Sequence, residues 1–177
     1  MTMTPRIRKL MLTAHLTISL GWLGAVIAYI PLDVIATTGQ DPRLVRAAYL
    51  SMDLIVRFAI VPLALAAMLT GIIQSLGTTW GLFRHYWVLV SLILTLLATT
   101  VLLIEANAIG HMAAEATSRP DPRAMSGSLF HSVGGLLVLL TVTILNIYKP
   151  RGLTRHGWRK QHEQRGEQHK QRTSPVT

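Results

Sequence analysis

The stretch YWVLVSLILTLLATTVLLI, residues 86–104, contains no charged residue in 19 positions. Three other stretches are similarly long and almost free of charge, at about residues 10–32, 54–76 and 129–148. An α-helix rises about 1.5 Å per residue, so about 20 residues cross the roughly 30 Å hydrocarbon core of a bilayer. In lipid every backbone polar group must be paired within the protein, and helices achieve this pairing. The sequence therefore predicts an all-α, four-helix transmembrane bundle with up-and-down topology.

The composition leaves room for these four helices and their connections, and for no second, water-soluble domain. Of 177 residues, 50% are hydrophobic and 14% are charged. The chain has no cysteine, which excludes disulfide bonds, iron–sulfur ligation, thiolate haem ligation and c-type haem attachment. Residues 1–149 are predicted to form the membrane domain. Residues 150–177 are predicted to form a basic cytoplasmic tail, whose polar, repetitive composition indicates disorder beyond residue 161.

The net charge of +9 reports topology rather than nucleic-acid binding, because the cations are distributed unevenly. Four arginines lie in the connections 33–53 and 105–128. The others precede the first span, lie between the second and third, or follow the fourth, except Arg57, which lies within the second span. By the positive-inside rule, both termini and the 77–85 loop are cytoplasmic. We therefore expect a multi-pass protein of the bacterial cytoplasmic (inner) membrane, with anionic inner-leaflet lipid as a partner and no nucleic acid.

The two connections on the other side are expected to be outer loops, at residues 33–51 and 105–128. Tyr29 and Pro31 are expected to end the first span at the outer interface. Within the first loop, residues 42–50 form a weakly amphipathic run that indicates a short surface helix. Pro62 is expected to kink the second span.

Ionisable side chains inside a span cost about 2.5 to 3.5 kcal/mol each, so every one needs an explanation. Near the outer ends of the spans these are Asp53, Arg57, Glu105 and His131, with His111 in the adjoining loop. The structural interpretation is an ion pair of Arg57 with Asp53 or with Glu105. The functional interpretation is a b-type haem whose iron takes His131, with His111 as a second ligand and Arg57 on the propionates.

Near the inner ends the ionisable candidate is His15, with Gln74, Asn146 and the boundary residue His85 at similar depths. The depths of His15 and His131 differ by about 18 Å, so they are expected to serve separate sites. A neutral His15 bonded to Gln74 or Asn146 is the structural interpretation. Haem, quinone and proton-relay roles are the functional ones.

The candidate cofactor-binding residues are therefore His15, His131, Arg57, His85 and His111, and haem b is the candidate cofactor for them. His15 and His131 are the candidate iron ligands. Small residues predict close helix packing within the bundle, with a membrane partner, or between copies of the chain. They are Gly21 and Gly24, Gly134 and Gly135, and the stripe Ser91, Thr95 and Thr99.

Several segments resemble known families. The segment Lys9-Leu-Met-Leu-Thr-Ala-His15, followed by Trp22, Gly24 and Pro31, resembles the first helix of HemJ-type protoporphyrinogen oxidases and CopD-like membrane proteins. HemJ-type proteins have a second histidine in that helix and a lysine in the third, and neither is present here. The resemblance therefore implies only that His15 is a haem ligand.

A closer resemblance is to an uncharacterised bacterial family of small, four-span predicted integral membrane proteins. It covers the first span and three further segments: WGLFRHYWVLV at 80–90, HSVGGLLVLL at 131–140 and YKPRGLT at 148–154. This resemblance implies a fold and a membrane location, and it implies no activity.

Three functions remain open on the sequence. The first is a b-type haem protein of electron transfer or redox chemistry. The second is a transport or channel component with the stripe as its path. The third is a noncatalytic accessory protein that binds a membrane partner. No phosphate-binding glycine loop, nucleophile elbow or zinc-protease motif is present, and whether the protein is an enzyme is left open.

Overall fold

The computed structural model describes residues 3–77, 82–125, 127–150, 152–155, 157–159, 162 and 166. The elements are α1 (Pro5–Thr38), α2 (Pro42–Ile55), η1 (Val56–Ile60), α3 (Val61–Gly77), α4 (Tyr86–Ser118), η2 (Pro122–Ala124) and α5 (Leu129–Tyr148). η1 is one π-helical turn and η2 a short 3₁₀ turn. Trp80, much of the predicted tail beyond residue 161, and a few connecting residues lie outside the described part of the chain.

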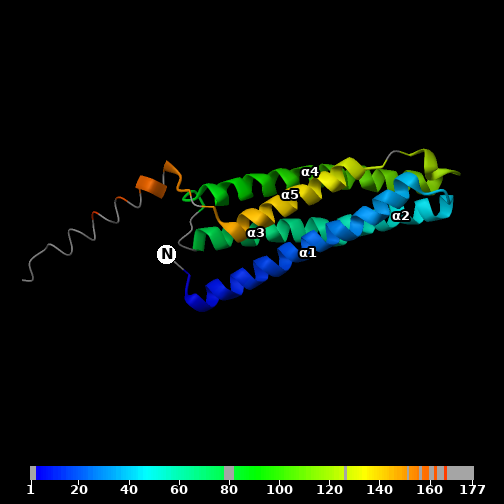
Figure 1. Cartoon of the computed structure of the whole chain (residues 1–177). Coiled ribbons are helices and arrows are strands. Elements are labelled where there is room, and N and C mark those ends of the chain that lie inside the picture. Colours follow the sequence, from blue (N-terminus) through cyan, green and yellow to red (C-terminus); the bar gives the residue numbers. More distant parts are fainter. Residues whose placement is uncertain are drawn as a thin grey trace, which may run out of the picture.

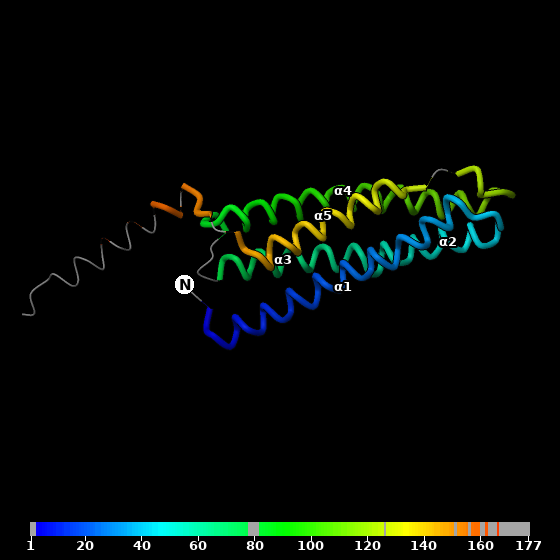
Figure 2. Tube along the Cα trace, viewed as in Figure 1, coloured from blue at the N-terminus to red at the C-terminus, as the bar shows by residue number. Residues whose placement is uncertain are grey.

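α2, η1 and α3 run on as one continuous rod, so four rods alternate in direction (Figures 1 and 2). α1 and α4 each contact the α2–η1–α3 rod on one side and α5 on the other. All four rods are long and apolar enough to cross a membrane. The predicted fold class is therefore confirmed: this is an all-helical, multi-pass membrane protein.

The bundle has two different ends (Figure 1). We call the end with the start of α1 and the end of α5 the terminal end, and the opposite end the loop end. α5 has 20 residues and is about 30 Å long, which matches the hydrocarbon core. α1 has 34 residues and is about 51 Å long, so it extends beyond α5 at both the terminal end and the loop end (Figure 1).

The expectation of outer loops at 33–51 and 105–128 is wrong for most of both segments. α1 continues through Pro31 to Thr38, only residues 39–41 separate it from α2, and α4 continues to Ser118. Asp41 caps α2 by accepting a bond from the Arg43 N–H. We call residues 33–38, 42–53 and 105–118 the helical cap.

The cap has a core of buried apolar side chains like that of a water-soluble protein. This core explains why these polar segments are helical. Val45, Ala48, Tyr49 and Met52 of α2 are 0–3% exposed. The predicted amphipathic run at 42–50 is indeed helical, but it packs into the cap rather than lying separately on a membrane surface. Its apolar face is buried, so tertiary packing stabilises a helix that its composition alone predicts weakly.

The second rod departs from α geometry directly before Pro62, the residue expected to kink it. The Val61 N–H donates to the Val56 carbonyl, five residues back. Proline has no N–H, so the regular α-helical bonding pattern is interrupted at this point. The π turn that results, η1, lies in the wall of the site described next.

Candidate functional site

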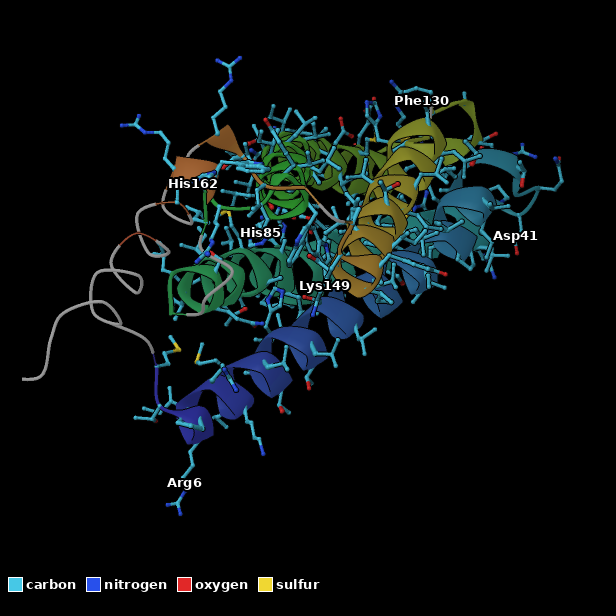
Figure 3. All side chains as sticks on the ribbon, turned by 60° about the vertical axis from the view of Figure 1, so that its left-hand side comes forward. Arg6, Asp41, His85, Phe130, Lys149 and His162 are labelled. Carbon is cyan, nitrogen blue, oxygen red and sulfur yellow. The ribbon has the colours of Figure 1, made fainter. Side chains whose placement is uncertain are left out.

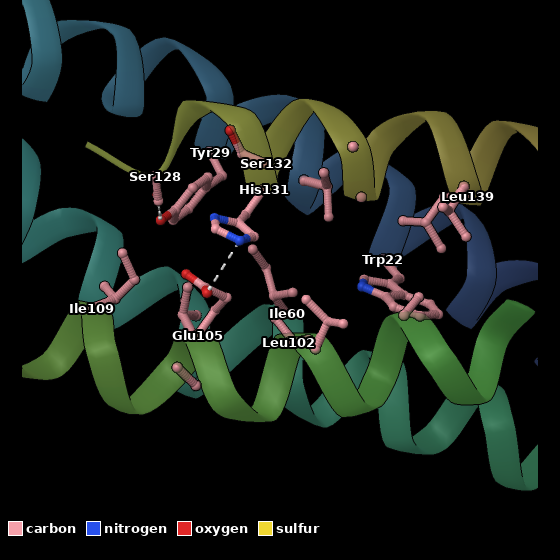
Figure 4. Close-up of a pocket in the computed structure, with 18 of the residues that line it drawn as sticks. Trp22, Tyr29, Ile60, Leu102, Glu105, Ile109, Ser128, His131, Ser132 and Leu139 are labelled. Atoms are coloured by element: carbon pink, nitrogen blue, oxygen red, sulfur yellow. Dashed lines mark hydrogen bonds and ion pairs between the residues drawn. The ribbon is translucent and has the colours of Figure 1, made fainter. Parts of the chain in front are cut away.

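A pocket of about 290 Å³ lies between α1, η1, α4 and α5 (Figure 4). Its wall is mainly apolar. The residues on which the argument depends are Trp22 and Tyr29 from α1, Val56 and Ile60 from η1, Glu105 from α4 and His131 from α5. Only Leu139 of α5 is fully buried, so α5 packs loosely over this side of the bundle.

The end of the pocket nearest the helical cap is polar. His131 Nε2 lies 3.6 Å from Glu105 Oε1, which makes an ion pair whenever His131 is protonated (Figure 4). The His131 side chain is 50% exposed and Glu105 is 25% exposed. The Tyr29 hydroxyl lies 3.1 Å from Ser128 Oγ at the same end. An acid, a base and a phenol therefore meet where the pocket approaches the cap.

The other end of the pocket contains an unpaired donor. Trp22 is 4% exposed, and its indole Nε1 has no hydrogen-bond partner among the described residues. Figure 4 shows this nitrogen turned toward the middle of the pocket. An indole N–H can only donate, so its bond can be satisfied only by an acceptor that enters the pocket.

The α5 wall leaves open space beside His131. A Cβ atom added at Gly134 or Gly135 would meet no atom within 4 Å. Both glycines line the pocket, one turn along α5 from His131. Phe130, also in the lining, is 87% exposed and lies on the outside of the bundle (Figure 3). The pocket therefore opens sideways, toward the surface that faces lipid.

A buried carboxylate positions the start of α5. Asp33 is 0% exposed, and its Oδ1 accepts from the Ser128 N–H at 3.1 Å. Its Oδ2 accepts from the hydroxyls of Ser128 and Ser132 at 3.1 and 2.7 Å. Because Ser128 donates to Asp33, the Tyr29 hydroxyl donates to Ser128. A Cβ added at Gly127 would press on Thr37 Cγ2 and lie 3.2 Å from Asp33 Oδ1, so a larger residue there would require Thr37 to move.

Two arginines, Arg46 and Arg123, make hydrogen bonds to groups in and beside the connection between α4 and α5. Arg46 donates from Nε to the Ala116 carbonyl at 2.7 Å and from Nη2 to the Arg119 carbonyl at 2.8 Å. It thereby caps the negative end of the α4 dipole. Arg123 is bonded to Asp121, and these hydrogen bonds lower the pKa of Asp121 to about 2.

The sequence predicted the polar pair at His131 only in part. Glu105 and His131 do meet, but Arg57 pairs with Asp53, Nε to Oδ1, at 2.6 Å, which confirms the structural interpretation. Neither Arg57 nor His111 lines the pocket. The roles of Asp33, Ser128 and Ser132 were missed, because Asp33 was assigned to a loop. The available signal was Ser128, a residue type that favours helix starts, directly before the fourth apolar stretch.

His15 lies elsewhere, as the depth argument predicts. Its Nδ1 is 3.0 Å from Thr70 Oγ1 on α3, so its partner is Thr70 rather than Gln74 or Asn146. Its ring packs on Gly71, where an added Cβ would lie 3.1 Å from Cε1. His85 directly precedes α4 and pairs with Leu153 in a single antiparallel bridge. Within the described residues, no three His, Asp or Glu side chains gather as a metal site.

Two of the three residues of the stripe on α4 are buried, and Thr95 is half-buried. Ser91 and Thr99 are 7% and 2% exposed, and neither lines the pocket. Their burial favours close helix packing over a transport path.

Comparison with protein-family models, curated proteins and solved structures found no match for this chain. The function is therefore inferred from the pocket and its residues.

Proposed function

We propose that this protein binds a lipid-soluble small molecule with a polar head in the pocket between α4 and α5. The observation that carries the proposal is an apolar pocket that opens toward lipid and ends in the paired side chains of His131 and Glu105. Binding sites for small molecules are mostly apolar, with a few polar groups that fix orientation. Ionisable groups within membrane helices are costly, and they commonly mark functional sites.

The η1 turn supports this assignment. Single π turns inside α-helices occur frequently at functional sites, because they shift side chains out of the regular helical register. Val56 and Ile60, the first and last residues of η1, both line the pocket. The irregular part of the second rod therefore shapes the wall of the proposed site.

The volume of about 290 Å³ is at the small end of the range for ligand pockets. It suits a single ring as the bound head. A hydrocarbon tail would leave through the mouth beside Phe130, which is exposed to the lipid side. The ligand would thus enter and leave within the membrane, without crossing water.

Filling the pocket tests this proposal. The probe is a fatty acid that carries a dinitrophenyl group, a single ring that accepts excitation energy from tryptophan, added to the protein in lipid nanodiscs. We expect saturable energy transfer from tryptophan to the probe, and at least tenfold weaker binding in Gly135→Leu. The matched control is Gly24→Leu, because Gly24 also has open space at Cβ but does not line the pocket. Absence of saturable transfer, or equal loss in both variants, would overturn the proposal.

A second candidate is b-type haem for electron transfer or redox chemistry, with His131 as an iron ligand. The open space over Gly134 and Gly135, one turn from His131, would let a flat macrocycle approach α5 closely. Haem would supply one-electron chemistry when bound. Arg57 and His111 do not line the pocket, so they do not supply the propionate partner and second ligand there.

An absorption spectrum distinguishes this candidate. Protein purified from haem-replete cells should show a Soret band that His131→Ala weakens, with His15→Ala as the comparison at the other histidine. Colourless protein removes the haem candidate and leaves the lipid-soluble ligand. Transport remains a weaker alternative, which solute flux in liposomes sensitive to bulky changes at Thr95 would support. A noncatalytic accessory role would be supported by a stable membrane partner or a homo-oligomer.

We also propose that the terminal end lies in the cytoplasm of a bacterial cell. Support comes from the fold, which places more of the described cations that flank the spans at the terminal end than at the loop end. Arg6, Arg8 and Lys9 start α1 there, and Lys149 follows α5 at the same end (Figure 3). Such cations favour the cytoplasmic side and contact with anionic lipid. Reporter fusions at both termini test this orientation, and a periplasmic signal from either would contradict it.

A further inference from the structure

We infer that the ligand of this pocket belongs to the quinone class, meaning a six-membered ring with hydrogen-bond-accepting oxygens at opposite corners. The inference rests on the proposed function and narrows it to one ligand chemistry. It comes from polar groups at the two ends of the pocket, which the apolar wall separates.

At the deep end, the donor is the Trp22 indole. Its Nε1–H is buried and unpaired among the described residues, within a wall that is otherwise apolar. Leaving a buried donor unpaired costs free energy, and a hydrocarbon ligand would not recover it. The ligand must therefore carry an acceptor on the part of the molecule that enters the pocket most deeply.

At the polar end, the donor is His131. A protonated imidazole has two N–H groups, so protonated His131 can pair with Glu105 through one and donate to a ligand oxygen through the other. The Tyr29 hydroxyl is not the donor, because its proton is bonded to Ser128. Tyr29 and Glu105 line this end of the pocket.

A 1,4-quinone carries its two oxygens on opposite corners of one ring, about 5 Å apart given carbonyl bonds of about 1.23 Å. One oxygen can therefore face the Trp22 indole while the other faces His131 at the opposite end of the pocket.

Other lipid-soluble molecules satisfy only one end. A fatty acid places its carboxylate at His131 but presents only methylene groups to Trp22. A sterol carries one hydroxyl on a fused ring system larger than the pocket favours. A ring with acceptors at both corners satisfies both donors and leaves its alkyl tail free to follow the mouth beside Phe130.

The test compares two probes that share one tail, a decyl-substituted 1,4-benzoquinone and decylbenzene. Each is titrated into the protein in nanodiscs, and its affinity is taken from the saturable rise in melting temperature. We expect the quinone to bind at least tenfold more tightly than decylbenzene. Trp22→Phe keeps the apolar ring but removes the N–H, so it should weaken quinone binding about fivefold and leave decylbenzene unchanged.

The matched control is Trp158→Phe, because Trp158 is 55% exposed and does not line the pocket. This variant should bind the quinone as the unchanged protein does. A measurement that needs no variant at Trp22 is the NMR spectrum of protein with ¹⁵N-labelled tryptophan. The quinone should shift one indole N–H signal strongly, and decylbenzene should not.

The outcomes distinguish failure of the quinone inference from failure of the proposed function. Equal affinities for the two probes, or an indole spectrum that the quinone leaves unchanged, would overturn the quinone class. If the dinitrophenyl probe still binds and Gly135→Leu still blocks it, the pocket proposal stands alone. If neither decyl probe binds saturably and the dinitrophenyl probe also fails, the quinone inference falls together with the proposed function.

Discussion

The helical cap and the terminal half of the bundle belong to the same long helices, but their apolar side chains are treated in opposite ways. In the cap, Tyr49 and Met52 are each 0% exposed. In the terminal half, Leu10, Leu69 and Leu76 are 59–67% exposed. Water drives apolar side chains together in the cap, whereas lipid offers them an apolar surrounding and gives no such drive.

The two regions also differ in the hydrogen bonds that their polar side chains make to other elements. In and around the cap, Asp33 and Arg46 each bond two or more groups on other elements and tie helix ends together. In the described part of the terminal half, the His15 side chain bonds only groups on the neighbouring helix α3, among them Thr70. Specific tertiary hydrogen bonding is therefore concentrated at the loop end. The pocket lies next to the helical cap, on the side of the terminal end. There α5 is bonded to other elements at its start, and few of its residues are buried along the rest of its length.

The largest expected effect comes from removing the carboxylate of Asp33. Asp33→Ala leaves the Ser128 N–H and two hydroxyls without their acceptor, so we expect the free energy of unfolding to fall by about 3 kcal/mol or more. SDS titration of the protein in bicelles measures this change. Asp41→Ala is the control, because Asp41 is an exposed helix cap and should cost about 1 kcal/mol. Equal losses would contradict the special role of the buried carboxylate.

A smaller effect is expected at Arg46. Arg46→Ala removes two bonds to the carbonyls at the end of α4, and we expect a loss of about 1.5 to 2 kcal/mol in the same titration. Arg43→Ala on the same helix should change stability by less than about 0.5 kcal/mol, because Arg43 is exposed. A loss at Arg43 as large as that at Arg46 would show that charge in α2 matters rather than capping.

The smallest effect is expected in the terminal half. Thr70→Val keeps the side-chain shape but removes the partner of His15, and bonds between membrane helices average about 0.6 kcal/mol. We therefore expect a loss below about 1 kcal/mol. Thr100→Val is the matched control, since the Thr100 hydroxyl bonds only its own helix, at the Leu96 carbonyl. A loss at Thr70 comparable to that at Asp33 would break the contrast between the two regions.

The features that sequence reasoning found are those that depend on local pattern. Runs of about 20 apolar residues predict spans wherever they occur, and all four long apolar rods are present. The Arg57–Asp53 pair was predicted as one of two alternatives, because residues four apart on a helix face each other. His15 and His131 were assigned to separate sites by counting residues along helices.

The cap and the pocket were not found, for a shared reason. Residues 33–51 are too polar to be read as a span, and only burial of Val45 and Tyr49 against neighbouring helices reveals why they are helical. Asp33 and Ser128 are 95 residues apart, so no local pattern indicates that they bond. The Trp22 indole is seen to be unpaired only in the folded bundle, where it lines the pocket.

By itself, the sequence determined the solvent of this protein, its helical class and the order of its spans, because the cost of placing polar groups in lipid acts on each segment separately. Only the tertiary structure decided which polar groups meet. The Asp33 network, the His131 and Glu105 pair and the unpaired Trp22 donor each depend on helices from distant parts of the chain. Hydrogen bonds and pockets form between surfaces, and packing sets those surfaces side by side.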